Sequence, residues 1–491
     1  MDYLLNHRIR CIFTLLLIFS GFAKIQAQNA ANYASPSFFF TSESQPLADM
    51  TGSTDLIGAG QTNTNSAVTP FVSAGQTFEV WFMGTRFTQF SVNTNGVLQF
   101  GTTAISPEAN TYAINTSEDR ISPLSSGTEI AGDVAPNLTG NFGTAPTTGK
   151  VHYKLFDTYP NRYVVVEWKD VLINFRNTST TVTFQAYIYE TTPRIDLFSF
   201  TAGGRIFYAY GEMPTEFLNS SLSGVGATVQ VGLGTGTNAG DYLGINLSGA
   251  APVPTIADND GEPNSSSFVN SVSTGLTIPL LHTTDAANRR VINFEVEDLS
   301  DTPSNFQAIC ITDTKIDLTW IDPASTDAIA SVIYRADGAG STDYNFIAQI
   351  PLGTTVYSDG GLTPGTTYNY RIYLVNEGKL SILGGSASVL ATTGIPAIYS
   401  NASGNWNDPT IWTTGTVPTA SDDVVINCSD VVSIDGDAFC NNLQINNTST
   451  LQFYDGGHTL AIAGDFVNFG KFDTYAVNAN TTLAGNLTHN G

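Results

Sequence analysis

The sequence is poor in the side chains that carry most protein chemistry. Its 491 residues include only 4 Cys and 5 His, and 19 Lys and Arg stand against 43 Asp and Glu, for a formal net charge of −24. A chain this acidic repels nucleic acid, so DNA and RNA are excluded as partners. The lack of any C-x-x-C pair argues against a zinc site built from thiolates.

Long apolar runs are also missing, except at the N-terminus. Arg8 and Arg10 precede an apolar run from Cys11 to Ala23, and Ile25-Gln-Ala27 ends in a small residue. This pattern is typical of an export signal cleaved before Gln28, and the run is shorter than the roughly 20 residues that span a bilayer. We therefore expect residues 1–27 to be a signal peptide, and the mature chain to be extracellular or at the cell surface without a membrane span.

The few remaining cysteines cannot form a disulfide framework, and a chain of this length does not need one. Cys428 and Cys440 are close enough in the sequence to form a disulfide. Cys310 lies in a predicted strand, where a buried free thiol is expected.

No stretch shows sustained helical periodicity, and short alternating strands with Gly, Pro and Asn turns recur throughout the chain. This predicts an all-β protein of several domains. The first domain is expected over residues 31–298. Its strongest hairpin signal is Asn95-Gly96 between apolar segments, a favoured two-residue turn. Further predicted strands are His152–Leu155, Arg162–Trp168, Thr181–Tyr189 and Arg194–Phe198, which together suit a two-sheet β-sandwich.

Several segments of this first region resemble a lectin-like β-sandwich of large secreted Bacteroidetes proteins. They are Phe82-Met-Gly84, Phe90–Gly96, Ile121-Ser-Pro123, Asn161–Trp168 and Phe184–Glu190. The resemblance covers about residues 70–240 and implies the fold more specifically than the function. This chain departs from the family after Pro123, where Leu124-Ser-Ser and later Gly132-Asp133 replace a Trp and paired Asp.

The second domain is expected over residues 304–394. A turn at Pro364-Gly365 leads into the alternating residues Tyr368, Tyr370, Ile372 and Leu374. Tyr368 is placed to hydrogen-bond back across the turn, as in the tyrosine corner of Greek-key sandwiches. With Trp320 as the large core aromatic of an earlier strand, these residues resemble a fibronectin type III (immunoglobulin-like) module.

The third region, residues 396–491, changes character. Short apolar pairs recur between Asn and Gly residues, which is typical of a β-solenoid. The opening, with Trp406 and Trp412, resembles the first coils of right-handed parallel β-helices in Bacteroidetes surface proteins, and the two tryptophans are expected to cap the stack. The apolar pairs are Val432/Ile434, Leu443/Ile445, Leu451/Phe453, Leu460/Ile462 and Phe466/Phe469. The repeat still runs at Gly491, without the sorting domain that relatives carry, which favours part of a longer protein.

Candidate catalytic groups are few. A Ser–His pair would have to use His152, His282, His458 or His489, and no Ser lies in a nucleophile-elbow context. Two carboxylates suffice for glycoside hydrolysis, and Glu167 and Glu190 lie in strands. Alternation places Glu167 on the face opposite Val166 and Trp168, where a solvated surface is expected.

Two further features suggest ligands. Asp258, Asp260 and Glu262 group oxygen donors around a Gly turn, which suits calcium, although the loop lacks the distal bidentate Glu of a full calcium motif. No other cofactor is expected. A set of aromatics could form a sugar-stacking platform if exposed: Trp81, Tyr159, Tyr163, Trp168, Tyr208 and Tyr210.

Together these features predict a secreted, multidomain β protein that is not an enzyme. Its expected role is adhesion, or carbohydrate or protein binding outside the cell. Two alternatives remain: accessory modules of a larger secreted polysaccharide hydrolase, and a structural stalk.

Overall fold

The computed structural model describes Tyr33 and most of the chain between residues 41 and 489. Gaps in the first region lie at 44–45, 63, 72–76, 108–117, 127–142, 160, 173–180, 192–203, 213–226, 235–241, 247–254, 259–269 and 273–288. Beyond it they lie at 312–313, 325–326, 339, 364–365, 382, 391–396, 428, 447 and 475. The predicted signal peptide and the predicted strand Arg194–Phe198 fall outside the described residues. The described part is all-β, as the sequence predicts.

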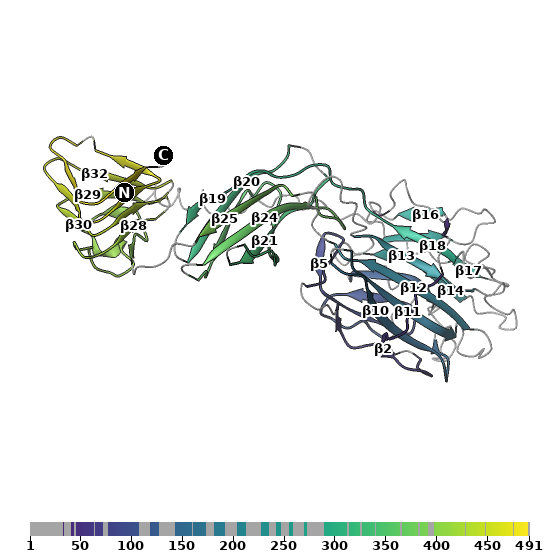
Figure 1. The fold of residues 1–491 in the computed structure, drawn as a ribbon. Coiled ribbons are helices and arrows are strands. Elements are labelled where there is room, and N and C mark those ends of the chain that lie inside the picture. The colour runs from purple at the N-terminus through teal and green to yellow at the C-terminus, as the bar shows by residue number, and fades with distance from the viewer. Residues whose placement is uncertain are drawn as a thin grey trace, which may run out of the picture. The chain divides into compact units, whose positions relative to one another are not determined.

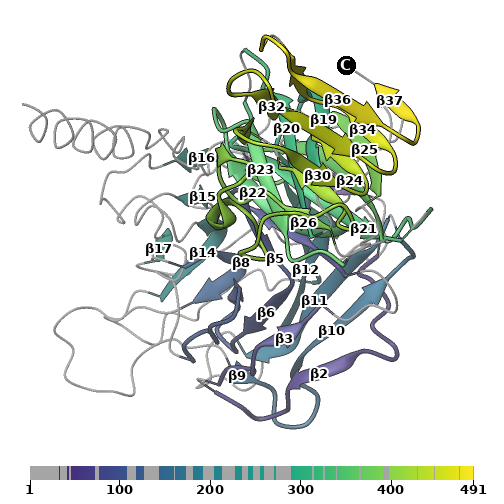
Figure 2. The same cartoon turned by 90° about the vertical axis from the view of Figure 1, so that its left-hand side faces the viewer.

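The first region holds two antiparallel sheets. One has the strand order β1-β18-β13-β12-β11-β10-β2, with β9 also paired to β11 (Figures 1 and 2). Its strands are β1 (Thr41–Glu43), β2 (Thr54–Ile57), β9 (Gly143–Thr144), β10 (Lys150–Phe156), β11 (Tyr163–Leu172), β12 (Thr181–Tyr189), β13 (Ile206–Tyr210) and β18 (Arg289–Phe294).

The second sheet has the order β16-β15-β14-β8-β7-β6-β3, with β17 paired to β14, and a separate hairpin joins β4 to β5. The bounds are β3 (Thr69–Pro70), β4 (Val80–Phe82), β5 (Thr85–Phe87), β6 (Gln89–Val92), β7 (Leu98–Phe100), β8 (Arg120–Ser126), β14 (Ala227–Gly234), β15 (Tyr242–Asn246), β16 (Thr255–Asp258) and β17 (Asn270–Val272).

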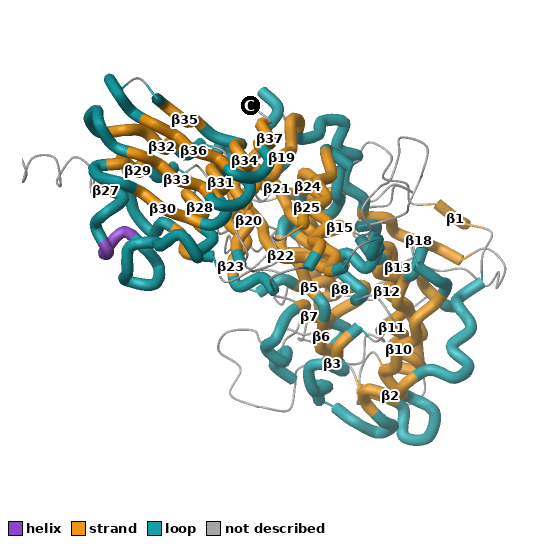
Figure 3. The backbone as a smooth tube through the Cα atoms, turned by 60° about the vertical axis from the view of Figure 1, so that its left-hand side comes forward, coloured by secondary structure: helices purple, strands orange, loops and turns teal. Residues whose placement is uncertain are grey.

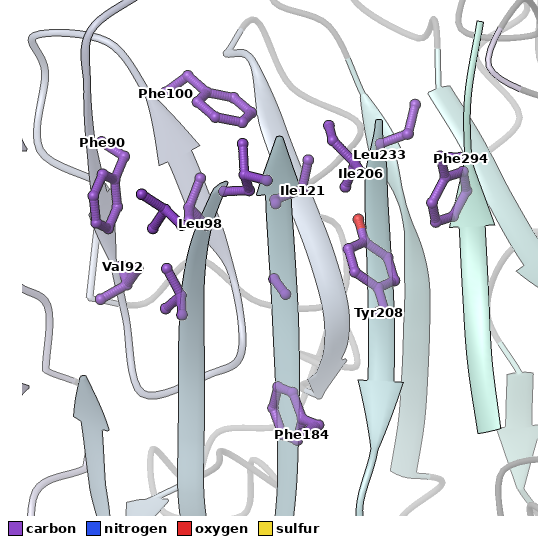
Figure 4. Packing of buried hydrophobic residues seen from close by; sticks show 14 of the residues in the cluster. Phe90, Val92, Leu98, Phe100, Ile121, Phe184, Ile206, Tyr208, Leu233 and Phe294 are labelled. Atoms are coloured by element: carbon purple, nitrogen blue, oxygen red, sulfur yellow. The ribbon is translucent and has the colours of Figure 1, made fainter. Parts of the chain in front are cut away.

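One hydrophobic core fills the space between these sheets, as in a β-sandwich. Strand alternation directs one set of side chains inward, and aromatic residues from both sheets meet there (Figure 4). Trp168 of β11 stacks on Phe184 of β12 with ring centroids 5.3 Å apart. The predicted Asn95-Gly96 turn joins β6 to β7. Gly96 has φ +84°, and a Cβ there would lie 1.9 Å from the carbonyl oxygen of Leu124, so no other residue fits.

Two short segments far along the chain belong to the same compact unit as this sandwich. They are Ser325–Ser331 and Tyr373–Leu383. The turn at Asn376–Lys379 is almost fully buried, because it packs against Tyr33, Gly84, Thr191 and the residues that follow β18.

The next strands form the two sheets expected of a fibronectin-like module. A three-stranded sheet has the order β19-β20-β23, and a four-stranded sheet the order β22-β21-β24-β25. Trp320, Tyr368 and Tyr370 lie in their shared core, as predicted for Trp320 and Tyr368. The bounds are β19 (Ser304–Ile311), β20 (Lys315–Ile321), β21 (Ala330–Asp337), β22 (Asn345–Pro351), β23 (Val356–Gly360), β24 (Thr367–Val375) and β25 (Gly385–Leu390).

The last region is a parallel β-solenoid, in which successive coils stack and their strands form three parallel sheets (Figure 3). Their orders are β26-β28-β31-β34-β37, β27-β29-β32-β35 and β30-β33-β36, and every pair is parallel. The elements are β26 (Ile398–Tyr399), β27 (Gly404–Asn405), the 3-10 helix η3 (Pro409–Ile411), β28 (Val424–Ile426), β29 (Val431–Ile434), β30 (Ala438–Cys440), β31 (Leu443–Ile445), β32 (Thr450–Phe453), β33 (Thr459–Ile462), β34 (Phe466–Asn468), β35 (Lys471–Asp473), β36 (Asn480–Leu483) and β37 (Leu487–His489).

The predicted apolar pairs line the solenoid core, with one exception. Phe466 points inward, but its inward partner is Asn468, and Phe469 is 39% exposed. Strand alternation explains this, because residues two apart share a face and residues three apart do not. Trp406 and Trp412 lie in the first coil, with ring centroids 5.0 Å apart. The indole Nε1 of Trp412 donates to the carbonyl oxygen of Trp406 at 2.8 Å.

An Asp/Asn ladder runs along one corner of the solenoid, where each coil enters the sheet of β28 and β31. Asp423 Oδ1 accepts from the backbone N–H of Asn442 at 3.1 Å, and Asn442 Oδ1 accepts from the backbone N–H of Asp465 at 2.7 Å. Asp465 Oδ1 then accepts from the backbone N–H of Asn486 at 2.8 Å. Each rung thereby satisfies a corner amide of the next rung, which a turn without strand partners would otherwise leave unpaired.

Candidate functional site

The outer face of the sheet that contains β10, β11, β12 and β13 carries one row of polar and one row of aromatic side chains. Cross-strand register places them in rows across β11: His152 and Gln185 flank Glu167, and Phe156 and Tyr189 flank Tyr163. The first row is polar and the second aromatic. A segment that precedes β2, residues 46–53 (the strap), packs over the polar row with Leu47, Ala48 and Met50 against the sheet.

The polar row is a continuous buried hydrogen-bond network. His152 Nε2 lies 2.6 Å from Glu167 Oε2, and His152 Nδ1 lies 2.5 Å from Ser53 Oγ of the strap. Gln185 donates to the other oxygen of Glu167 at 2.6 Å, and its Oε1 accepts from the N–H of Ala48. A single tautomer satisfies all partners: His152 donates from Nε2 to the carboxylate and accepts at Nδ1 from the Ser53 hydroxyl.

The sequence prediction for Glu167 is right about its direction and wrong about its exposure. Glu167 does point away from Val166 and Trp168, but it is only 6% exposed, so the expected solvated surface is wrong. The strap covers it, and the strap comes from a part of the chain about a hundred residues earlier. A buried carboxylate persists only with partners, and here it has two.

Ser53, His152 and Glu167 follow the bonding order of a Ser–His–acid triad, a grouping that no sequence motif indicates. The nitrogens are exchanged, however: in hydrolase triads the serine lies on Nε2 and the acid on Nδ1. His152 itself is 2% exposed. The geometry therefore suits a buried anchor that fastens the strap to the sheet.

The aromatic row consists of Phe156, Tyr163, Tyr187, Tyr189 and Phe207, one or two from each of four adjacent strands. Tyr187 is buried, and the other four are partly exposed. Phe156 stacks on Tyr163 at 5.1 Å, Tyr163 on Tyr189 at 4.9 Å, and Tyr187 on Phe207 at 3.9 Å. Burial and the nearby Asp157 raise the pKa of Tyr163, so its phenol stays protonated.

The orientation of these rings decides what they can contact. Phe156 and Tyr163 are inclined by only 6° with centroids 5.1 Å apart, which is an offset stack in which each ring covers part of its neighbour's face. Cations lie over the outer rings: Lys154 Nζ is 4.8 Å from the Phe156 centroid, and the Arg205 guanidinium is 5.1 Å from that of Phe207. The row therefore presents mainly ring edges and hydroxyls to solvent.

The predicted sugar platform divides into two groups. Trp81, Trp168, Tyr208 and Tyr210 are core residues with 0% exposure, so they are no surface platform. Tyr159 is 48% exposed, and Tyr163 belongs to the aromatic row. Sequence reasoning missed Phe156, Tyr187, Tyr189 and Phe207. Phe156 and Tyr189 lie at strand ends in register with Tyr163, and this is the signal that could have identified them.

Glu190 is likewise buried and paired. The guanidinium of Arg162 donates to both of its oxygens, from Nε at 2.7 Å and from Nη2. Desolvation raises the pKa of Glu190 above its ordinary value, against the opposing effect of Arg162. A carboxylate held in this way supports the end of β12 and is not free to act on a substrate.

The predicted calcium loop falls almost entirely outside the described residues. Asp258 is the last residue of β16, whereas Asp260 and Glu262 are not described. Within the described parts of the chain, no three His, Cys, Asp or Glu side chains converge as a metal site. Calcium at this loop stays a prediction. Over the same parts of the chain, no helix is both long and apolar enough to cross a membrane.

Cys440 is a free thiol that points into the solenoid core from β30. Cys428 lies outside the described residues, so the predicted disulfide between them is not seen here. Burial, with Asp423 nearby, raises the pKa of the Cys440 thiol to about 12.

Cys440 should therefore resist alkylation in the native protein. Because the thiolate is the reactive form, a thiol with so high a pKa and no exposure reacts slowly at pH 8. We expect iodoacetamide to leave the Cys440 peptide unmodified in native protein and to modify it fully in guanidinium, as read by peptide mass spectrometry. Native modification at the rate of an unfolded peptide, or a mass showing Cys440 already bonded to Cys428, would contradict this.

Tyr368 forms the predicted tyrosine corner. Its hydroxyl accepts from the backbone N–H of Thr363 at 2.8 Å, and the Arg335 guanidinium lies 5.0 Å from its ring. Arg335 also binds Asp359, which accepts from the hydroxyl of Tyr370 at 2.8 Å. These contacts fix the turn before β24.

Replacing Tyr368 with Phe should destabilise this module by about 0.5–1.5 kcal/mol, because the ring packing remains and one backbone N–H loses its partner. Urea denaturation of the full chain, followed by hydrogen exchange in β20 and β24, measures the change. Tyr454→Phe is the control, since Tyr454 is 70% exposed. Equal effects of the two changes would show that the hydroxyl of Tyr368 has no role in stability.

Comparison with known proteins bears on the first region. Residues 37–274 match the family described as NIDO related. No curated protein sequence matches the chain.

Solved structures similar to part of the chain include fibronectin type III domains. A human fourth FNIII domain is 20% identical over 21% of this chain and 90% of its own length, with a TM-score of 0.18. The fn3 domain of human contactin 1 is 14% identical over 22% and 88%, with a TM-score of 0.19. An Fn3-like protein from Clostridium thermocellum is 26% identical over 18% and 88%, with a TM-score of 0.16. The fibronectin-like fold of the second module is assigned from the strand order of β19–β25 alone. Residues 37–274 are thus similar to NIDO-related domains, and a fibronectin-like sandwich and a short β-solenoid follow them.

Proposed function

We propose that this protein is a secreted, non-catalytic binding protein that adheres to an extracellular macromolecule through the aromatic row. Tyr, Phe and Arg are the residue types enriched at protein–protein contacts. The observation that carries the proposal is a partly exposed line of stacked aromatics across four strands, whereas most other large aromatics among the described residues are buried. The N-terminal export pattern and the domain types support a place outside the cell.

The ring orientation favours a protein ligand over a glycan. A sugar ring packs on the open face of an aromatic ring, and the faces of this row are covered by neighbouring rings and by Lys154 and Arg205. Edges and hydroxyls suit a flat protein surface, where stacked rings lose little conformational entropy on binding. Glycan binding is the second candidate, because Tyr159 is 48% exposed, although the Arg162 guanidinium lies over its ring at 5.5 Å.

Binding of the full mature chain to immobilised collagen, fibronectin and mucin, and to a glycan array, tests this proposal. The variant carries Tyr163→Ser and Tyr189→Ser, and the matched control is Tyr454→Ser in the solenoid. We expect a protein ligand in the panel to lose about tenfold or more of its affinity with the double variant only. Binding that survives the double variant would refute the aromatic row as the contact surface. No binding to any probe would favour a structural stalk.

The non-catalytic part of the proposal has its own test. A fluorophosphonate probe labels serines activated by a histidine base. We expect no labelling of the full chain at Ser53. Labelling that Ser53→Ala and His152→Ala both abolish would show an activated nucleophile and would favour the modules of a hydrolase.

A further inference from the structure

The buried turn at Asn376–Lys379 carries an inference that goes beyond the binding role. We propose that segment Tyr373–Leu383 is an integral part of the first sandwich, so that residues 31–298 do not form an independent folding unit. The residues of the sandwich that surround this segment, which include Tyr33, Gly84, Thr191 and Gly204, are called the slot. The segment and the sandwich belong to one compact unit although they are far apart in the sequence.

The slot recognises the backbone of the turn. The carbonyl oxygen of Glu377 accepts from the hydroxyl of Tyr33 and from the backbone N–H of Gly84, both at 2.9 Å. The carbonyl oxygen of Gly378 accepts from the hydroxyl of Thr191 at 3.2 Å. Donors from three separate parts of the sandwich therefore converge on two neighbouring peptide units. Without the turn, these buried donors would lose their partners.

Shape selects glycine at the centre of the turn. A Cβ on Gly378 would lie 2.8 Å from the hydroxyl oxygen of Tyr33 and 3.0 Å from a methyl carbon of Val296. On the other side, a Cβ on Gly204 would lie 1.9 Å from the carbonyl oxygen of Gly378. Two glycines thus let two backbones approach more closely than any side chain permits.

The residue that follows Gly378 is a lysine, which two carboxylates of the first region bind. Lys379 is 7% exposed, and its ammonium donates to Glu295 at 2.7 Å and to Asp298 at 3.0 Å. Both carboxylates lie just beyond β18, whose last residues are in the sandwich core. Asn376 fastens the same stretch, since its Nδ2 donates to the carbonyl oxygen of Glu297 at 2.9 Å. The turn and the end of β18 therefore hold each other in place.

Hydrogen exchange on the full mature chain tests the inference, because it reports each strand separately. Gly378→Val should overfill the slot, and Lys379→Met should remove the charge while keeping most of the side-chain volume. We expect amide protection in β13 and β18 to fall by about tenfold or more with Gly378→Val, and by less with Lys379→Met. Protection in β29 and β32 of the solenoid should not change.

Lys315→Met is the matched control, since Lys315 pairs with Asp317 and its side chain is 46% exposed. It should leave the protection of the sandwich unchanged. If Gly378→Val cannot be purified, Lys379→Met alone decides. A loss of protection confined to residues 373–383, or none at all, would overturn the proposal, because the sandwich would then be stable without the segment.

Discussion

Glu167→Ala is expected to destabilise the first sandwich by about 2–6 kcal/mol, because it leaves two buried hydrogen-bond donors unsatisfied at about 1–3 kcal/mol each. The change leaves His152 and Gln185 without their shared acceptor beneath the strap. The affected contacts include Ser53 and Ala48, so the strap should loosen together with the sheet. Hydrogen exchange in β10, β11 and β12 of the full chain, across a urea series, measures the loss.

Two variants sharpen this experiment. Glu167→Gln keeps an oxygen acceptor and should cost less than the alanine change. Asp55→Ala removes the partner of Lys150 from a surface pair in which the Asp side chain is 59% exposed, and should cost about 0–1 kcal/mol. If Glu167→Ala is as mild as Asp55→Ala, the polar row is solvated and the strap does not seal it.

Trp412→Ala is expected to have an effect of similar size in the solenoid, about 3–5 kcal/mol. Its indole is 1% exposed, packs against Trp406 and donates to that residue's backbone, so the change opens a cavity and breaks a hydrogen bond. A short repeat array has few neighbouring interfaces, so the loss at its first coil should spread along the stack.

The solenoid effect is read as lost amide protection in β29, β32 and β33. Tyr454→Ala is the matched control, because it removes an aromatic side chain that is 70% exposed. Protection lost only around residues 398–412 would mean that the first coil frays alone and does not support those that follow.

Strand positions were largely predictable from the sequence, because alternation is a local property. The Asn95-Gly96 hairpin, the pairing of β10 with β11 and the tyrosine corner at Tyr368 all follow from patterns within a few residues. The solenoid core followed in the same way. Phe469 is the exception, because residues three apart in a strand do not share a face, and its side chain is 39% exposed.

Burial was less predictable, because it depends on what covers each face. Val80, Trp81 and Phe82 are all buried, so both faces of β4 are covered. Alternation along the strand would have placed one of Trp81 and Phe82 at the surface. Glu167 lies on the predicted face, but the strap that covers it is distant in the sequence. For the same reason, the sequence divided the chain at residue 298 and gave no sign that residues 373–383 complete the first sandwich.

The Asp/Asn ladder of the solenoid has a consequence for how such chains change in length during evolution. Successive ladder residues are 19, 23 and 21 positions apart, yet at each step a side-chain oxygen accepts from the backbone N–H of the next ladder residue. The corner fixes the register of every coil, and the extra residues of longer coils lie in the turns between sheets. Insertions and deletions in the turns should therefore be tolerated, whereas one within a ladder corner would shift every coil beyond it.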